Sequence, residues 1–485
     1  MSRSLIRKAH EAMVSKKISC LELVNWYISE IKKSDINSFI TLTEELALDS
    51  AKRVDNKIQN GEEIGLLEGI PMSLKDNFST KNILTTCASK MLENYYPIYN
   101  ATVYDVLMDS GCVLLGKTNL DEFAMGSSNE TSYFGPVKNP HNKNKVPGGS
   151  SGGSCAAVAA GLSVFAMGSD TGGSIRQPSS FCGIVGFKPT YGAISRYGVI
   201  PLASSLDCVG SLTLSVEDAS ILFDLLSFHD PKDEQCSSIE REPTFDHLND
   251  EISNLRIGVP TNCFYGSNDE VYNAVENAVK FYEDLGASVS FFEFPELDLS
   301  MPIYCVLGRA ETSSNMSRFD GIRYGYKYDG KYEDINDLMT KTRSIAFGEE
   351  VKRRILLGNY VLSAGHDALY KKSLNLRRFV NEAFDKKFSE FDVLMMPSSP
   401  TTAFDFNYAE GDPLKMQLAD ICVVPANISG LPAISIPCGY DSDNLPIGLQ
   451  IIGKKWSDDL VFRVANKYES ENFFAKIIGG VQYEI

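Results

Sequence analysis

Apolar residues recur at helical spacing near the N-terminus of the chain. Ser19 and Glu22 enclose the sequence SCLE, a capping box in which each side chain can bond the backbone N–H of the other residue. The apolar positions that follow are spaced as on one face of a helix, which predicts an amphipathic helix. A second helix is predicted over residues 42–59, so residues 1–60 are expected to form a helical region packed on the main core.

Beyond residue 60, short apolar runs alternate with turns rich in Gly, Pro, Ser and Asn. Strands are predicted within 69–78, 112–116, 162–170, 255–260, 391–402, 431–439 and 446–454. Helices are predicted in the first part of 101–119, up to a glycine, over 152–161 and 268–286, and through much of 335–395. The polar stretch 228–250 is expected to be a surface loop. This alternation predicts an α/β fold whose sheet has both faces covered.

Composition narrows the class of protein. With 485 residues, 43% of them hydrophobic, the chain can bury a large core, and its 22% charged residues do not indicate disorder. The net charge of −17 disfavours direct binding of nucleic acid, because the phosphate backbone is also negative.

The cysteines and histidines argue against a metal centre. Eleven cysteines contain no C-x-x-C pair, and five histidines form no H-x-x-x-H or H-E-x-x-H motif, so no zinc site is expected. Scattered cysteines are typical of a reducing compartment. The N-terminus lacks the apolar segment of a signal peptide, and no 18-residue apolar stretch occurs, so we expect a soluble cytoplasmic protein without membrane contact.

Two glycine-rich serine clusters carry the candidate chemistry, PGGSSGGS at 147–154 and DTGGSIRQP at 170–178. A flexible linker is disfavoured because each cluster adjoins a predicted buried element. Neither cluster has the lysine of a P-loop or the G-x-G-x-x-G of a dinucleotide site. The first cluster contains G-x-S-x-G, the pattern of an α/β-hydrolase nucleophile, but the sequence around the candidate partners His366 and His247 has no distinctive motif.

A lysine is the other base that could activate a serine. Burial lowers the pKa of a lysine and lets it accept a proton. Lys75 ends a predicted apolar strand in PMSLKDNF and is the first candidate, although a lysine there can also be a structural ion-pair partner. Lys188, in GFKPT, is the second candidate.

Taken together, SLKDN, GGSSGGS and DTGGSIRQP resemble the signature of the amidase signature family. The strongest resemblance covers residues 65–215, and weaker similarity spans nearly the whole chain, which implies a single domain over 1–485 with an α/β/α sandwich around a central mixed sheet. Five further segments resemble the glutaminase branch of the family, in which the enzyme supplies ammonia to a tRNA-dependent amidotransferase: 116–130, 186–207, 313–325, 352–358 and 427–439.

The resemblance implies a Ser-Ser-Lys triad. Ser174 would be the nucleophile, Ser150 would relay its proton after a cis peptide bond, and Lys75 would be the terminal base, ahead of Lys188. Ser151 is the less favoured relay by one residue of spacing. The backbone N–H groups of Thr171, Gly172, Gly173 and Ser174 would form the oxyanion hole.

The resemblance also implies a site for glutamine. Arg354 would bind the α-carboxylate and Asp420 the α-ammonium group, unless the two form an ordinary surface ion pair. The remaining residues implied to line the pocket are Met125, Gly126, Ser127 and Tyr304.

The implied activity is hydrolysis of glutamine through a γ-glutamyl ester on serine, with the ammonia passed to a partner. The expected assembly is a heterotrimer with the B and C subunits of the amidotransferase, which converts Glu-tRNA(Gln), or both Glu-tRNA(Gln) and Asp-tRNA(Asn), to the amidated form. ATP, Mg2+ and misacylated tRNA would belong mainly to the partner, and this chain would need no cofactor or metal. The alternatives are a stand-alone amidase for other small amides and a non-catalytic scaffold, which the intact triad argues against.

Overall fold

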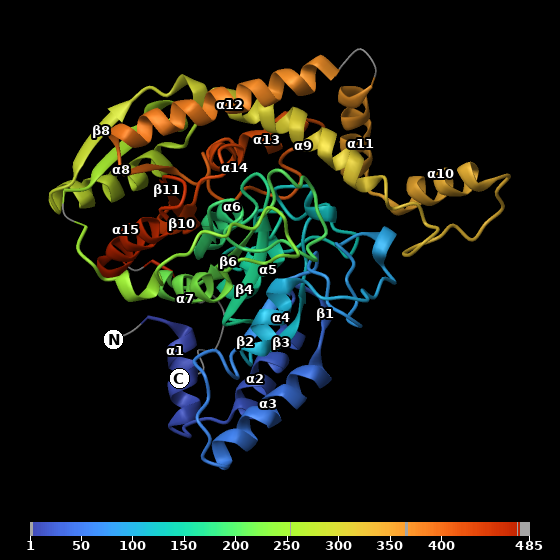
Figure 1. Ribbon diagram of the computed structural model, residues 1–485, viewed down its shortest axis with the longest axis horizontal. Helices are drawn as coiled ribbons and strands as arrows, with labels where there is room; N and C mark the ends of the chain where they lie inside the picture. The colour runs from blue at the N-terminus through green and yellow to red at the C-terminus, as the bar shows by residue number, and fades with distance from the viewer. Residues whose placement is uncertain (1–2, 253, 364–366, 473, 476–485) are drawn as a thin grey trace.

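A single sheet runs through the computed structural model, which describes residues 3–252, 254–363, 367–472 and 474–475 (Figure 1). Within these residues the sheet has 11 strands in the order β1-β3-β2-β4-β6-β5-β10-β11-β9-β7-β8. The strands are β1 Phe39–Leu42, β2 Pro71–Lys75, β3 Val113–Thr118, β4 Phe165–Asp170, β5 Val185–Lys188, β6 Cys208–Thr213, β7 Arg256–Pro260, β8 Ser288–Phe292, β9 Val393–Pro397, β10 Ala433–Tyr440 and β11 Pro446–Gly453.

Helices cover this sheet and form an outer group beyond it. The α-helices are α1 Leu5–Val14, α2 Cys20–Lys33, α3 Glu44–Gln59, α4 Thr102–Asp109, α5 Gly152–Ala159, α6 Arg176–Cys182, α7 Val216–Leu226, α8 Asp269–Asp284, α9 Ser300–Met316, α10 Ile335–Ala346, α11 Glu349–Leu362, α12 Asp367–Glu390, α13 Pro413–Leu418, α14 Val424–Ile428 and α15 Asp458–Glu471. The short 3-10 helices are η1 Lys90–Leu92, η2 Glu122–Ala124, η3 Phe245–His247, η4 Thr261–Phe264 and η5 Pro295–Leu299.

The sheet is mixed, as the sequence predicts. Strand β2 is parallel to both β3 and β4, and β7 is parallel to β8 and β9, whereas the other neighbouring pairs are antiparallel. This confirms the predicted α/β class with a large mixed sheet.

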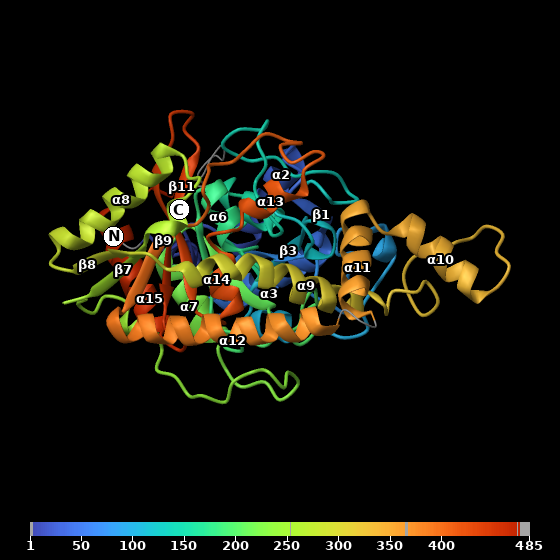
Figure 2. The ribbon, with the colours of Figure 1, turned by 90° about the horizontal axis from the view of Figure 1, so that it is seen from above.

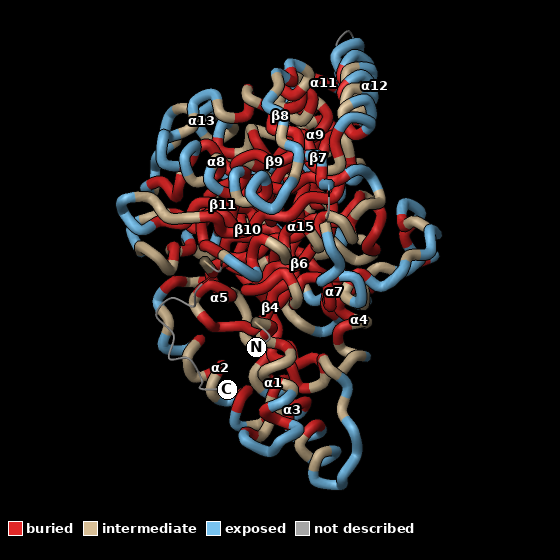
Figure 3. Tube along the Cα trace, turned by 90° about the vertical axis from the view of Figure 1, so that its left-hand side faces the viewer, coloured by how far each residue is buried: buried red, intermediate tan, exposed pale blue. Residues whose placement is uncertain are grey.

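Alternating side chains of β11 show how the two faces of the sheet are covered. Leu449 and Ile451 belong to the large apolar core, which also includes residues of α8 and α15. Gln450 points the other way and accepts a hydrogen bond from Arg176 of α6 at 2.5 Å. The centre of the sheet is therefore buried on both faces, and Figure 3 shows the buried strands inside an outer layer of exposed loops and helix faces.

Helices α9, α11 and α12 form the outer group on one side of the molecule. They contact one another, and α9 and α12 run side by side in both views (Figures 1 and 2). Helix α10 projects away from the rest of the molecule in the same two views. Helix α11 matters for the site because it carries Arg354.

The predicted helices near the N-terminus are present, with one boundary corrected. Helix α2 begins at the predicted capping box, and both of its reciprocal hydrogen bonds are formed. The prediction of a helix from residue 42 is wrong at its start, because Leu42 is the last residue of β1 and pairs with Gly116 of β3. The hydrogen bonds of the sheet edge hold Leu42 extended, and the helix begins at Glu44.

The parallel strands β2, β3 and β4 bring three loops to one edge of the sheet. Parallel strands end at the same edge, and ligands of open α/β sheets bind outside these carboxyl ends. Lys75 ends β2, the loop with Ser127 follows β3, and the second serine cluster follows β4. The fold therefore gathers predicted site segments that lie far apart in the sequence.

Candidate active site

Lys75 lies fully buried at the end of β2, surrounded by oxygen atoms. Its Nζ donates to the Oγ atoms of Ser150 and Ser151, each at 2.8 Å, and to Ser169 Oγ at 3.0 Å. Burial lowers the pKa of Lys75 to about 8, although the nearby carboxylates of Asp121 and Asp170 oppose the shift. The amine can therefore lose its proton near neutral pH and act as a base.

The first serine cluster offers two hydroxyls to Lys75. The peptide bond between Gly149 and Ser150 is cis, as the family resemblance implies. Ser151 Oγ donates its proton to the carbonyl oxygen of Ser169 at 3.2 Å. Ser150 is the donor in none of the side-chain hydrogen bonds of the described residues. The distances to Lys75 do not separate the two serines, but among the described residues Ser151 Oγ has a backbone carbonyl as a second partner and Ser150 Oγ does not, which favours Ser150 as the relay.

Ser174 opens into a cavity and lies next to the first serine cluster. Its side chain lines a cavity of about 790 Å³, and its carbonyl oxygen accepts from the N–H of Ser151 at 3.1 Å. Among the described residues no hydrogen bond joins the hydroxyls of Ser150 and Ser174. Bonds between catalytic groups are often long without substrate and tighten when it binds.

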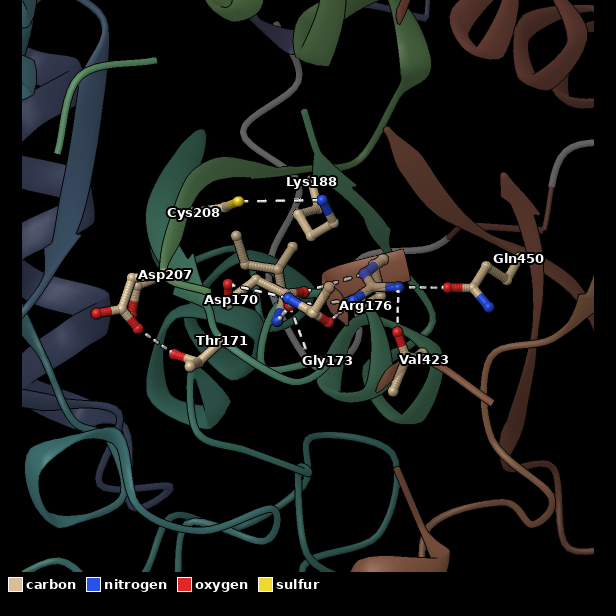
Figure 4. Close-up of polar contacts among 12 residues, drawn as sticks. Asp170, Thr171, Gly173, Arg176, Lys188, Asp207, Cys208, Val423 and Gln450 are labelled. Atoms are coloured by element: carbon tan, nitrogen blue, oxygen red, sulfur yellow. Dashed lines mark hydrogen bonds and ion pairs between the residues drawn. The ribbon is translucent and has the colours of Figure 1, made fainter. Parts of the chain in front are cut away.

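The loop of the predicted oxyanion hole is held from behind by two carboxylates (Figure 4). Thr171 donates through Oγ1 to Asp207 at 2.6 Å, and the N–H of Gly173 donates to Asp170 at 2.8 Å. The Gly173 N–H is therefore engaged and does not face the cavity in this conformation. Gly172 lines the cavity, where a Cβ would lie 2.7 Å from Cζ of Tyr304, so the close packing requires glycine.

Asp170 and Arg176 form a buried ion pair beneath this loop (Figure 4). Burial acts to raise the pKa of Asp170, but the Arg176 guanidinium outweighs it and holds that pKa below its usual range. Arg176 also donates to the carbonyl oxygen of Val423 at 2.9 Å and to Gln450. Both residues lie in the DTGGSIR motif, but the motif alone does not indicate that they pair.

The predicted glutamine-binding residues come together at the same cavity, with one exception. The lining includes Gly126, Ser127, Gly172, Ser174, Tyr304, Arg354 and Asp420. The side chain of Met125 is fully buried in the second apolar core and is not among the residues that line the cavity. The resemblance placed Met125 in the lining, but the structure does not. Burial in the core removes the large apolar side chain from water, which is more favourable than exposing it in the cavity.

Two side chains of opposite charge face this cavity from different elements. Arg354 donates through Nε to Glu350 Oε1 at 2.7 Å, one helical turn earlier in α11. Asp420, between α13 and α14, accepts a hydrogen bond from Ser127 Oγ on Oδ2, while its buried Oδ1 has no partner. Burial raises the pKa of Asp420 to about 8. A cationic group in the cavity would satisfy Oδ1 and favour the ionised carboxylate.

Glu350 was missed by the sequence analysis. Its spacing of four residues from Arg354 in EEVKRR is the spacing of an intrahelical ion pair and could have identified it. Among the described residues Arg354 thus pairs with Glu350 and not with Asp420, and it lines the cavity.

The second candidate base, Lys188, and the candidate histidine His247 lie apart from the serines. Lys188 donates to the carbonyl oxygen of Pro189 at 2.9 Å and lies 3.9 Å from Cys208 Sγ, with no bond to a serine hydroxyl (Figure 4). His247 bonds the neighbouring Asp250 on the surface at 3.0 Å. His366 lies outside the described residues. The geometry thus favours Lys75 over Lys188 and His247.

The described ranges contain no group of three or more His, Cys, Asp or Glu side chains arranged to hold a metal ion. Across the same ranges, the helices are too short or too polar to span a membrane.

Comparison with known proteins places the chain in a family. The sequence profile of the family described as Amidase matches residues 22–462. The A subunit of glutamyl-tRNA(Gln) amidotransferase from Thermoanaerobacter pseudethanolicus is 49% identical over 484 residues, which cover 98% of this chain and 99% of that protein. The protein of the same name from Carboxydothermus hydrogenoformans is 47% identical over 470 residues, with 96% of each covered.

Solved structures agree with the sequence comparison. The crystal structure of the glutamyl-tRNA(Gln) amidotransferase A subunit from Thermotoga maritima superposes with a TM-score of 0.79 at 38% identity, covering 94% of this chain and 95% of that one. A 6-aminohexanoate cyclic dimer hydrolase superposes with a TM-score of 0.83 at 25% identity, with 98% of each chain covered. Proteins whose names give different activities therefore share this fold. The match across most of its length shows that this chain belongs to the amidase family.

Proposed function

We propose that this chain is the glutamine-hydrolysing component of a tRNA-dependent amidotransferase. The observation that carries the proposal is the shared cavity, in which the candidate nucleophile Ser174 lies with Arg354 and Asp420. The near full-length identity of 49% to the A subunit of a glutamyl-tRNA(Gln) amidotransferase supports the same conclusion.

In the proposed reaction, Ser174 Oγ attacks the carboxamide carbon of glutamine. Its proton moves through Ser150 to neutral Lys75, which lies 2.8 Å from Ser150 Oγ. The C–N bond then breaks, and Lys75 returns the proton to the departing ammonia. Water hydrolyses the resulting γ-glutamyl ester by the same groups, which releases glutamate and restores Ser174.

The oxyanion formed in each step needs backbone donors near Ser174. We propose the N–H groups of Thr171, Gly172 and Ser174 for this role, with Gly173 able to contribute only if its bond to Asp170 is released. Donors fixed before the reaction stabilise developing charge without reorganisation, and removing one costs roughly 100- to 1000-fold in rate.

Arg354 and Asp420 supply the recognition of an α-amino acid. The guanidinium would bind the α-carboxylate of glutamine, and the unpartnered Oδ1 of Asp420 would accept from the α-ammonium group. A simple amide has neither group. This pair therefore distinguishes a glutaminase from an amidase for other small amides.

The partners and cofactors follow from the proposed reaction. We propose that the B and C subunits of the amidotransferase complete a cytoplasmic heterotrimer, and that the first of these binds misacylated tRNA, ATP and Mg2+. This chain would then need no cofactor of its own. Its net charge of −17 is consistent with tRNA being bound elsewhere.

Co-purification from the native host tests the proposal. The chain is isolated with its bound proteins, and release of glutamate from glutamine is assayed with and without misacylated tRNA. We expect two companion proteins and glutaminase activity that rises with the tRNA. Hydrolysis of butanamide in preference to glutamine would instead support the stand-alone amidase.

A further inference from the structure

Glu122 is a buried carboxyl group that the proposed mechanism does not use. It lies in DEFAMGSS, within the segment 116–130 that the sequence analysis singled out, and begins η2, which leads directly to the loop with Gly126 and Ser127. Its residue is 2% exposed. A buried carboxyl group is unfavourable unless its oxygens are bonded, so its partners indicate its role.

Those partners lie far along the chain, at the start of the helix that carries Arg354. Glu122 Oε2 accepts from the backbone N–H of Gly348 at 2.8 Å, across 226 residues of sequence. Gly348 is the N-cap of α11, so this bond holds the first turn of the helix. Glu122 Oε1 accepts from Ser89 Oγ at 2.5 Å, which fixes the carboxyl group from its other side.

The fit around Gly348 is tight. A Cβ on this glycine would lie 2.4 Å from Glu122 Oε2, so only glycine allows the bond. The ring of Phe123 lies 5.8 Å from that of Phe347, which packs the two segments together beside the hydrogen bond. The contact between η2 and the junction of α10 and α11 is therefore both polar and apolar.

The neighbouring Asp121 connects the same segment to the first serine cluster. Its backbone N–H donates to the carbonyl oxygen of Ser150 at 3.3 Å, and its Oδ2 accepts from the N–H of Asn129 at 2.9 Å. Two consecutive residues thus link the first serine cluster to the helix of Arg354.

We propose that Glu122 is a positioning residue that fixes α11 relative to the Gly126–Ser127 loop and so sets the separation between Arg354 and Asp420. Ser127 holds Asp420, and Arg354 lies six positions beyond Gly348, about 9 Å along the helix axis. A misplacement of about 1 Å at a binding group can cost 100-fold in activity. The inference rests on the proposed function, because it concerns the recognition of glutamine by these two groups.

The test compares two substrates and two replacements of Glu122 in the full chain, purified with its bound proteins. Butanamide has the carboxamide chain of glutamine without its α-amino and α-carboxylate groups. For Glu122→Ala we expect KM for glutamine to rise about 10- to 100-fold, while kcat/KM for butanamide changes less than about twofold.

Glu122→Gln should restore the wild-type values for both substrates. Its amide oxygen can accept from Gly348, and its NH₂ group can donate to Ser89 Oγ, which lies 3.4 Å from the carbonyl oxygen of Ala346 and can donate onward. Burial raises the pKa of Glu122 to about 7, so a neutral side chain of the same shape is a fair replacement. Gly348→Ala breaks the link from its other end and should match Glu122→Ala.

Asp218 provides the control. This buried carboxylate also accepts a backbone N–H at the start of a helix, that of Leu5 in α1 at 3.0 Å. Asp218→Ala should lower the melting temperature, but it should change the kinetic constants for glutamine and butanamide to the same extent. A merely structural role of Glu122 would give this same pattern.

The inference is overturned if Glu122→Ala and Gly348→Ala affect glutamine and butanamide equally, or if Glu122→Gln behaves like Glu122→Ala. If one variant does not fold, the other decides. The wild-type complex distinguishes a failure of this inference from a failure of the proposed function. If the wild-type complex does not hydrolyse glutamine, the proposed function itself is contradicted.

Discussion

The amine of Lys75 and the carboxyl group of Asp420 both have a pKa of about 8, and burial is the cause of both shifts. Burial lowers the pKa of the first and raises that of the second, each to about 8. In the proposed mechanism both groups must lose a proton before they act, Lys75 to become a base and Asp420 to bind an ammonium group. At the scale of single residues, activity should therefore depend steeply on pH.

The expected pH profile differs between two substrates. Below about pH 8, log kcat/KM for butanamide should rise with a slope of one, because only Lys75 must be deprotonated. For glutamine the slope should approach two, since Asp420 must also be ionised. Initial rates from pH 6 to pH 9, with Lys75→Ala as the inactive control, measure both slopes. Equal slopes would remove Asp420 from glutamine recognition.

Arg354→Ala tests the other end of the proposed clamp. Removing one partner of a desolvated charge pair typically costs 2 kcal/mol or more, so KM for glutamine should rise about 30-fold or more. Hydrolysis of butanamide should change little, because it has no α-carboxylate. Arg353, which also bonds Glu350, is the matched control, and Arg353→Ala should have the smaller effect. The reverse order of effects would move the carboxylate site to Arg353.

At the scale of elements, the packing of the glycine loop against α9 connects the nucleophile to the substrate pocket. Gly172→Ala places a Cβ 2.7 Å from Cζ of Tyr304, so the loop or the ring must move. We expect kcat to fall roughly 100-fold, the typical effect of losing one oxyanion donor. Gly308→Ala on α9 is the control, because its Cβ meets the same ring at an ordinary 3.6 Å. Similar kcat values for the two variants would contradict the assignment.

The sequence predicts an element well when a local pattern determines it, and poorly when pairing with a distant segment does. Helix α2 and strand β3 follow from local patterns, a capping box and an apolar run after a glycine stop. Strands β5 and β6 were not predicted, because their burial depends on partners distant in sequence, such as β10 beside β5. The end of β1 at Leu42 is likewise decided by pairing with β3.

The same limit applies to the candidate site. Lys75, Ser150 and Ser174 lie in motifs with a distinctive sequence, and the structure brings their segments to one edge of the sheet. The burial of Met125 and the link from Glu122 to Gly348 depend on packing between distant segments. No local pattern carries that information, so these features had to be seen in three dimensions.

At the scale of the whole molecule, the fold is shared while the chemistry of the cavity is specific. A cyclic dimer hydrolase superposes with a TM-score of 0.83 at only 25% identity, so the sheet and its helices do not select the substrate. We propose that the selection falls to residues on α11, the turn before α14 and the Gly126–Ser127 loop, which line the same cavity.

The central claim is that glutamine is cleaved through an ester on Ser174. The most direct test mixes the purified complex with glutamine, quenches it in acid within milliseconds, and maps acylated peptides by mass spectrometry. We predict a glutamyl adduct on the peptide that contains Ser174, and neither adduct nor glutamate release in Ser174→Ala. An adduct on Ser150, Ser151 or any other residue, or glutamate release that persists in Ser174→Ala, would contradict the claim.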